Sequence, residues 1–357
     1  MKLAKLALFA GVAALAATGL LASDADAQKR VRWKMQSAFG STLPLLGEGA
    51  IRFTKNVAEM TDDRFQIKFF EPGALVPPLE CFDAAAKGSV DLCWTTPGYY
   101  TGKYPALAFF SAVPFGPNLG EFMAWKKFGN GDKLMNEIFA KHGLVFIDAY
   151  CHGAETSGWF KNQLKSMDEL KGLKMRFFGL GAKVMQKFGV STQLLAGADI
   201  YPALERGVID ATEFSMPTMD IKFGFYQIAK NNYFPGWHQQ TSCGGLLLAK
   251  SQIDGLPKSY KKILEITASE GMAYIFADSE ARNPAAMQEM QTKHGVKVRR
   301  WSDAELGRYE QAWLDVIKEE SANDPLFKKV ADDYLAFRKT YRIWGNAQAL
   351  KSTYLDN

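Results

Sequence analysis

The segment Tyr201-Pro-Ala-Leu-Glu-Arg-Gly-Val-Ile-Asp-Ala-Thr-Glu213-Phe214 predicts a helix, a helix stop and a short strand in immediate succession. The apolar helix ends in a basic residue and a glycine, which commonly stop a helix, and the strand that follows ends at a carboxylate. The segment from Phe82 to Trp94 repeats this order, with Lys87-Gly88 at the stop and Trp94 at the strand end. Two similar α/β lobes are therefore expected.

The ends of these strands predict a binding crevice, because ligands of open α/β sheets bind outside the carboxyl ends of the strands. Arg176 lies near the end of the strand expected at 174–177, and Gly179-Leu-Gly181 follows as a helix start whose free amides also favour an anion. An arginine is an always-charged, bidentate partner for a carboxylate. A small organic anion is the first ligand to consider, and the competing interpretation is a surface arginine paired with a nearby acid.

The rest of the chain fits an α/β class. Residues 31–35 and 65–69 alternate like strands, and apolar residues at helical spacing from Leu46 to Met60 join them into a β-α-β unit. Ser166 with Glu169, and Ser302 with Glu305, match the capping box and mark two helix starts. Further strands are expected at 90–94, 144–147, 174–177, 245–249 and 296–299.

The carboxyl-terminal region from Leu256 onward has an almost wholly helical pattern. It closes with an apolar stripe formed by Val330, Tyr334, Phe337, Tyr341 and Trp344. Such a stripe needs cover, either from the protein's own core or from a second copy of the chain.

The first 27 residues predict a secretory leader. Lys2 and Lys5 precede an apolar run from Leu6 to Leu21, and Ala25-Asp-Ala27 is a small-x-small cleavage site. The run is alanine-rich and falls short of the ~20 residues of a membrane span, so the mature protein is expected to be exported.

Four cysteines, at positions 81, 93, 151 and 243, then lie in an oxidising compartment. Their spacing contains no CxxC pair. A Cys81 to Cys93 disulfide and small buried hydrophobic residues are both consistent with the pattern.

Composition and motifs argue against several other classes of function. The net charge of +5 is mildly basic, and the lysines and arginines are scattered without a long basic run, so nucleic acid is not an expected partner. Gly179-Leu-Gly181 lacks the third glycine of a dinucleotide fingerprint, and the sequence contains no GxSxG, Walker A or HExxH motif. Cys151 and His152 near Glu155 suggest a transition metal only weakly, because no second ligand cluster accompanies them.

Several segments in this order resemble the periplasmic solute-binding proteins of tripartite ATP-independent periplasmic (TRAP) transporters, in the branch that binds 2-oxo acids and related monocarboxylates. The resemblance covers nearly the whole mature chain. The segments that carry it are Tyr99-Tyr100-Thr-Gly-Lys103, Gly158-Trp159-Phe160, Leu173-Lys-Met-Arg176, Tyr201 to Phe214, Tyr233-Phe-Pro-Gly-Trp237 and Asp324-Pro-Leu-Phe327.

This resemblance implies a two-lobed α/β fold with a helical carboxyl-terminal region. The expected parts are a signal peptide at 1–27, lobe I at 28–154, lobe II at 155–236, a return to lobe I at 237–300 and carboxyl-terminal helices at 301–357. It also implies delivery of a small carboxylate to TRAP membrane subunits, periplasmic localisation, no catalytic cofactor, and pairing of two copies through a terminal helix as the alternative cover for the apolar stripe.

By resemblance, Arg176 docks the ligand carboxylate and a sodium or calcium ion bridges the ligand to oxygen ligands. The cation positions map to Glu155, Glu213, Phe214 and Gln239. Substrate contacts map to Glu155, Arg176 and Phe214. Trp94 and Tyr100, with Tyr99 beside them, belong to the first lobe's strand end and loop, where they form either pocket or core.

Three of these positions depart from the family pattern. This chain carries Glu155 where relatives commonly carry glutamine, Gln239 where they carry a second glutamate, and Phe214 where they carry tryptophan. The acid and the amide have exchanged places, so the formal charge of the cation site is unchanged. Phe214 keeps an aromatic wall without an indole donor, which favours a bulkier or more apolar ligand side chain.

The sequence thus predicts a receptor that captures a 2-oxo or 2-hydroxy monocarboxylate and performs no chemistry. An exported enzyme acting on an organic acid is the alternative from another class. A receptor module of an ATP-driven importer or of a signalling system would have the same two-lobed architecture.

Overall fold

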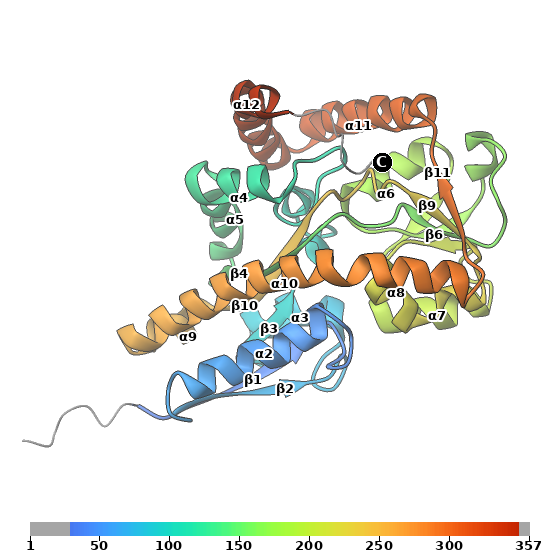
Figure 1. Cartoon of the computed structure of the whole chain (residues 1–357). Coiled ribbons are helices and arrows are strands. Elements are labelled where there is room, and N and C mark those ends of the chain that lie inside the picture. Colours follow the sequence, from blue (N-terminus) through green and yellow to red (C-terminus); the bar gives the residue numbers. More distant parts are fainter. Residues whose placement is uncertain (1–28, 350–357) are drawn as a thin grey trace, which may run out of the picture.

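The β-α-β unit at the start of the chain forms one side of a five-stranded sheet in the computed structural model, which describes residues 29–349 (Figure 1). The expected leader therefore lies outside the described residues. Helix α2 (Leu46–Glu59) connects β1 and β2, whose alternating side chains pair in parallel. The sheet order is β2-β1-β3-β10-β4, and its strands are β1 (Val31–Ser37), β2 (Phe65–Phe70), β3 (Leu92–Thr95), β4 (Leu144–His152) and β10 (Ser242–Ala249).

A second, six-stranded sheet contains the strand that leads to Glu213. Its order is β11-β9-β5-β8-β6-β7. The strands are short: β5 (Gly158–Phe160), β6 (Lys174–Arg176), β7 (Ser191–Gln193), β8 (Ala211–Thr212), β9 (Asn231–Phe234) and β11 (Lys297–Arg300). Because β11 pairs with β9, residues 297–300 belong to this second sheet rather than to the return segment of lobe I, and that part of the expected boundary is corrected. The other lobe boundaries stay a prediction.

Short helices flank the two sheets and complete the α/β architecture. Figure 1 shows α2 and α3 beside the first sheet, and α6, α7 and α8 beside the second. Their bounds are α3 (Cys81–Ala86), α4 (Leu119–Phe128), α5 (Gly131–Ala140), α6 (Gly179–Lys187), α7 (Gly197–Glu205), α8 (Pro217–Phe223) and α9 (Lys250–Asp254). Among residues 29–349, 3-10 turns lie at Pro78–Glu80, Pro97–Tyr100, Pro105–Phe110, Met167–Leu170 and Phe225–Gln227.

Three long helices tie the two lobes together. Helix α10 (Lys258–Thr292) runs across the molecule and contacts α2 and β4 on one side and α8 on the other (Figure 1). Helix α11 (Asp303–Asn323) packs on α6, and α12 (Pro325–Gln348) packs on α4 and on the turn at Pro105–Phe110. The capping box at Ser302 and Glu305 is confirmed, whereas Ser166 caps only a 3-10 turn.

The apolar stripe of α12 divides into a buried and an exposed part. Val330 and Tyr334 are buried, and the Tyr334 ring meets Phe109 and Trp125 with centroids 5.4 and 5.1 Å apart. Trp344, near the end of the helix, is 60% exposed. The protein's own core therefore covers the first half of the stripe only.

All four cysteines form disulfides. Cys81 bonds to Cys93, which was one of the two alternatives left by the sequence, and Cys151 bonds to Cys243. The second bridge joins directly opposed residues of the antiparallel strands β4 and β10. Cys151 is consequently not available as a metal ligand.

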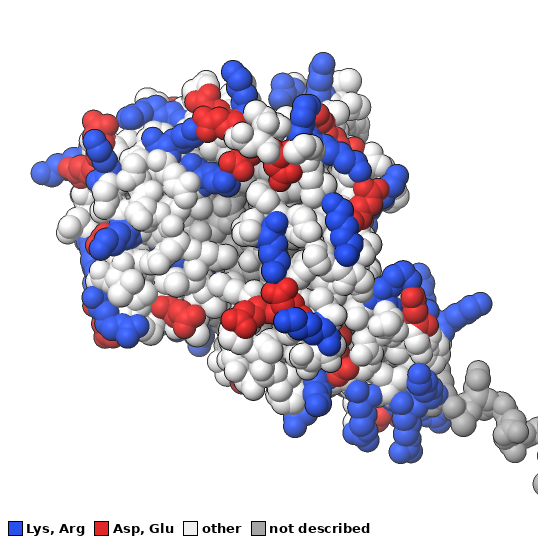
Figure 2. Space-filling model, turned by 180° about the vertical axis from the view of Figure 1, so that it is seen from behind, with Lys and Arg blue, Asp and Glu red and all other residues white. Residues whose placement is uncertain are grey.

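The surface carries both signs of charge. On the face shown in Figure 2, basic and acidic side chains are intermixed around a largely uncharged central area. Within residues 29–349, no helix is both long and apolar enough to cross a membrane.

Candidate functional site

A pocket between the two sheets collects side chains from both lobes and from the segments that connect them. The cavity volume open to a water-sized sphere is about 30 Å³, which is room for about two water molecules, so the pocket walls lie close together in this structure. Its lining residues are Phe39, Leu46, Thr96, Tyr99, Tyr150, His152, Glu155, Arg176, Phe178, Phe214, Ser215, Gln239 and Ser242.

A β-bulge in the first sheet directs Tyr150 toward this pocket. Gly245 lies opposite Asp148 and Gly244 lies opposite Tyr150, so Ala149 is the extra residue on β4. In a regular strand, the side chains of residues 148 and 150 would lie on the same face of the sheet. The bulge places them on opposite faces. Gly245 has no room for a Cβ, which would lie 2.1 Å from the carbonyl oxygen of Ile147.

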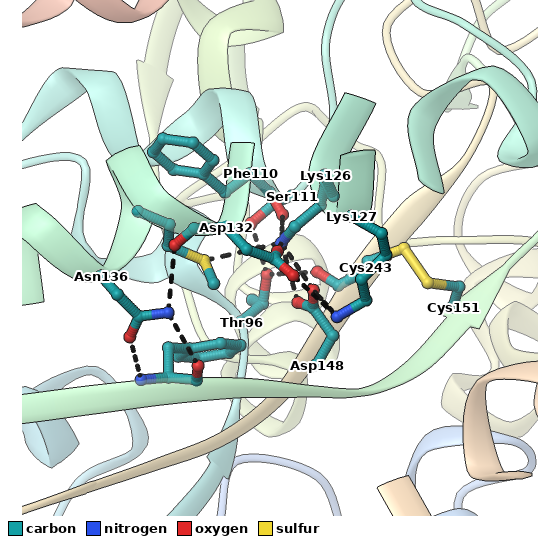
Figure 3. A network of polar contacts seen from close by, with 12 residues as sticks. Thr96, Phe110, Ser111, Lys126, Lys127, Asp132, Asn136, Asp148, Cys151 and Cys243 are labelled. Carbon is teal, nitrogen blue, oxygen red and sulfur yellow. Dashed lines mark hydrogen bonds and ion pairs between the residues drawn. A yellow bond between two sulfur atoms is a disulfide. The ribbon is translucent and has the colours of Figure 1, made fainter. Parts of the chain in front are cut away.

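The reversed register leaves Asp148 on the opposite side of β4, in the buried network of Figure 3. Nζ of Lys126 donates to Oδ1 of Asp148 at 2.9 Å and forms an ion pair with Oδ2 at 2.8 Å. Burial raises the pKa of Asp148, and the nearby charge of Lys126 opposes that rise. In the same network, Ser111 and Thr96 share a hydroxyl hydrogen bond of 2.7 Å, which fixes Thr96 at the pocket wall.

Arg176 lies at the end of β6, where the strand meets the pocket, and is 1% exposed. Its Nη1 donates to the carbonyl oxygen of Glu213 at 2.8 Å and to Oε1 of the same residue at 2.7 Å. Its Nε donates to the carbonyl oxygen of Leu195 at 3.2 Å. Among the described residues, Nη2 has no hydrogen-bond partner, so one arm of the guanidinium fork is left for a ligand.

Glu213 holds the other side of this ion pair and is fully buried. Its Oε1 also accepts from the backbone N–H of Phe178 at 2.5 Å, at the amino end of α6. Burial alone would raise the pKa of Glu213, but the charge of Arg176, the His238 ring and this N–H together lower it. Glu213 is therefore a carboxylate with one oxygen already engaged.

Glu155 approaches from the segment between β4 and β5. Its Oε1 accepts from the hydroxyl of Ser215 at 3.1 Å and lies 3.5 Å from Nε2 of His152. Its Oε2 is buried and has no hydrogen-bond partner in the described structure. The second oxygen of each glutamate thus faces the same small region.

His238 occupies that region, although no role was predicted for it. Its Nε2 lies 3.7 Å from Oε2 of Glu155 and 3.6 Å from Oε2 of Glu213. Burial opposes a charge on the ring, but the two carboxylates outweigh that effect and raise the pKa of His238 to about 9. One atom from each of the three side chains lies within 4.8 Å of the others, a spacing suited to a metal ion.

Several buried polar atoms around this point have no hydrogen-bond partner in residues 29–349. They are Oε2 of Glu155, Oε2 of Glu213, both ring nitrogens of His238 and Oε1 of Gln239. Buried polar atoms are nearly always paired in native proteins, so a convergent unpaired set indicates a missing partner. Because most of these atoms are acceptors, the residues fit a bound cation.

The other expected site residues divide into two groups. Phe214 lines the pocket and lies under Arg176, whose guanidinium carbon is 5.4 Å from the ring centroid. Trp94 and Tyr100 do not reach the pocket wall: Trp94 packs between Phe53 and Tyr150, and the Tyr100 hydroxyl bonds Thr95 at 2.9 Å. A cation ligand at Phe214 stays a prediction.

Tyr99 and Tyr150 take the places expected for Tyr100 and Trp94. Tyr99 and Tyr100 are consecutive in a 3-10 turn, where neighbouring side chains point about a third of a turn apart, so of these two only Tyr99 faces the pocket. Burial raises the pKa of Tyr99 to about 12, although the charge of Arg176 opposes the rise. The hydroxyl therefore stays protonated and can donate a hydrogen bond.

Comparison with known protein families gives one match over most of the chain. Residues 37–324 match the bacterial extracellular solute-binding proteins of family 7. A monocarboxylate 2-oxoacid-binding periplasmic protein of Nostoc sp. is 37% identical over 320 residues, which cover 90% of this chain and 87% of the relative.

Two solved structures are also similar. A TRAP transporter solute-binding protein of Bordetella bronchiseptica, a dimer with calcium and picolinate in its active site, superposes with a TM-score of 0.87 at 30% identity, covering 90% of this chain and 95% of that one. A TRAP periplasmic solute-binding protein of Pseudoalteromonas atlantica with bound sodium and pyruvate gives 0.85 at 27% identity, covering 90% and 97%.

Proposed function

We propose, on the premise that the chain belongs to the bacterial extracellular solute-binding proteins of family 7, that it is a TRAP receptor for small 2-oxo or 2-hydroxy monocarboxylates. The relatives that bind 2-oxo acids, pyruvate or picolinate support this ligand class. The receptor would hand the ligand to TRAP membrane subunits.

The observation that carries the proposal is the free arm of Arg176 beside a set of unpaired acceptors in the pocket between the lobes. Nη2 offers a donor to one carboxylate oxygen of the ligand, and the neighbouring Tyr99 hydroxyl offers a second donor from lobe I. Phe39, Leu46 and Phe214 form an apolar wall suited to the ligand's side chain. Contacts from both lobes are strengthened when closure excludes water.

A bound cation completes this proposal. Glu155, Glu213 and Gln239 would hold it through their unpaired oxygens, in agreement with the calcium and sodium of the two similar structures. When bound, the cation neutralises the glutamates and attracts the ligand's carboxylate and 2-oxo oxygens. Without a cation, the two buried carboxylates would repel an anionic ligand.

Binding without turnover is part of the same proposal, as are export after removal of residues 1–27 and pairing of two copies at the exposed end of α12. The alternative is an exported enzyme acting on an organic acid. In the receptor, Arg176 binds both Glu213 and the ligand, and neither residue needs to transfer a proton.

The test is isothermal titration of the mature protein with pyruvate and 4-methyl-2-oxopentanoate, in sodium, in calcium and after chelator treatment. We expect one site per chain, cation-dependent affinity and recovery of unchanged acid by NMR. Consumption of the acid would establish the enzyme instead, and no binding of either acid under any of these conditions would remove the proposed ligand class.

A further inference from the structure

The ring of His238 lies beside the position proposed for the cation. Its Nε2 is 3.7 Å from the unpaired oxygen of Glu155 and 3.6 Å from that of Glu213. Two ligands of a tetrahedral zinc ion with bonds of ~2.1 Å are roughly 3.4 Å apart. The observed separations therefore match two ligands of one metal ion.

The two carboxylates are the only charged groups that the ring contacts in the described residues, and a metal ion would take the place of the proton that the ring holds between them. Both of its ring nitrogens are buried and unpaired, so the ring is held by packing rather than by hydrogen bonds. The Phe177 ring lies edge-on to it at 4.9 Å, and the Trp237 ring lies at 5.6 Å. A rigidly packed imidazole that faces two carboxylates is a preformed half of a metal site.

Nitrogen changes the metal preference of the site. Sodium and calcium are hard cations that select oxygen ligands, whereas imidazole suits zinc and its neighbours in the first transition series. An all-oxygen set of Glu155, Glu213 and Gln239 would suit the hard cations. Adding Nε2 of His238 gives the mixed carboxylate and imidazole set of many zinc sites.

The charge of the pocket also favours a divalent ion. Glu155, Glu213 and the ligand's carboxylate would contribute three negative charges, and Arg176 contributes one positive charge. Two negative charges then remain in a buried space, and a divalent cation neutralises them where sodium would leave one uncompensated.

We propose that His238 is a nitrogen ligand of the bound cation and that the pocket consequently selects a divalent ion of the zinc class over sodium or calcium. This inference rests on the proposed receptor function, because the cation would share the pocket with the carboxylate ligand. Cys151 contributes nothing to the set, since it is bonded to Cys243.

The test begins with tag-free mature protein stripped by chelator and titrated with Zn²⁺, Ca²⁺ and Na⁺ in the presence of pyruvate. We expect one Zn²⁺ per chain, bound at least 100-fold more tightly than Ca²⁺. His238→Gln replaces the nitrogen by an oxygen and is expected to weaken Zn²⁺ by at least about 100-fold, beyond the 10–100-fold typical of an outer-sphere partner, and to change Ca²⁺ affinity by less than about threefold.

The matched control is His142→Gln, which removes an exposed histidine whose Nε2 contacts the hydroxyl of Tyr104 at 2.8 Å, outside the pocket. It is expected to bind Zn²⁺ like the unmodified protein. Equal loss in both variants would assign the zinc to surface histidines and overturn the inference.

X-ray absorption at the zinc edge of the unmodified protein tests the ligand without relying on a variant. One imidazole in the zinc shell is expected, and a shell of oxygens alone would overturn the proposal even if His238→Gln fails to fold. Zn²⁺ affinity that His238→Gln leaves unchanged, in a protein that still binds pyruvate, would leave the receptor function standing and remove the role of His238. Zinc bound through an imidazole, with no binding of any 2-oxo acid, would support the role of His238 and remove the proposed receptor function.

Discussion

Replacing Arg176 by lysine separates the charge of this side chain from its fork-shaped geometry. Arg176 makes three hydrogen bonds, to the carbonyl and carboxylate oxygens of Glu213 and to the carbonyl of Leu195. Lysine keeps a positive charge beside Glu213, so the buried carboxylate is not left alone. A single ammonium replaces only one of the three bonds in this geometry.

The expected magnitudes follow from these contacts. Loss of two hydrogen bonds at about 1 kcal/mol each lowers the free energy of unfolding by about 2 kcal/mol. Loss of the free Nη2 arm removes one charge-assisted bond to the ligand, worth about 2 kcal/mol, so the Kd for pyruvate is expected to rise about 30-fold.

Urea unfolding followed by tryptophan fluorescence measures the first effect, and isothermal titration in a fixed cation measures the second. Arg206→Lys is the matched control, because Arg206 is exposed and its Nε bonds only the carbonyl oxygen of Pro202, at 3.1 Å. A folded Arg176→Lys protein whose Kd stays within threefold of the unmodified value would refute the docking role of the guanidinium.

Three further predictions concern the same region. The double substitution Cys151→Ala with Cys243→Ala removes a disulfide that joins residues with a sequence separation of 92. It is expected to lower the free energy of unfolding by up to about 4.5 kcal/mol. Urea titration in chelator-free buffer, compared with the oxidised and the reduced unmodified protein, measures this loss. In chelator-treated protein, folding raises the pKa of His238 from 6.5 to about 9. The protonated ring therefore stabilises the fold fully below pH 6.5, and this contribution is lost as the pH rises to 9. Melting temperatures measured between pH 6 and 10 are expected to fall less steeply in His238→Gln than in the unmodified protein. Phe214→Trp narrows the pocket and is expected to weaken 4-methyl-2-oxopentanoate at least about fivefold more than pyruvate in competition titrations, whereas a tenfold preference of the unmodified protein for pyruvate would contradict the roomier wall.

Much of the fold is predictable because it depends on local periodicity. Alternation at 31–35 and 65–69 predicts two strands that each bury one face. The helical spacing between them predicts a crossover helix, which is how two successive strands pair in parallel. The helix, glycine and strand order of Tyr201 to Phe214 likewise brings Arg176 and Glu213 onto adjacent parallel strands. Their ion pair follows from that adjacency.

The missed features depend on contacts between segments far apart in the chain. His238 meets Glu155 and Glu213 only after two lobe connections and a strand end converge, and no local pattern distinguishes it among four histidines. The need of two buried acids for a positive partner was the available signal. Tyr150 reaches the pocket because of a one-residue bulge in β4, and Gly244-Gly245 was the sequence feature that marked this bulge.

The Cys151 to Cys243 bridge limits where the lobes can pivot. It fastens β4 to β10 one residue pair before both strands leave the first sheet, so bending of these two connections is confined to residues 153–157 and 235–241. Within these short spans, the backbone N–H of Glu155 donates to the carbonyl oxygen of Gln239 at 3.1 Å. The side chains that would grip a cation are thus carried by the joint itself. An ion held by Glu155 and Gln239, as proposed, would brace this joint, and its departure would loosen the pivot and the grip on the ligand together.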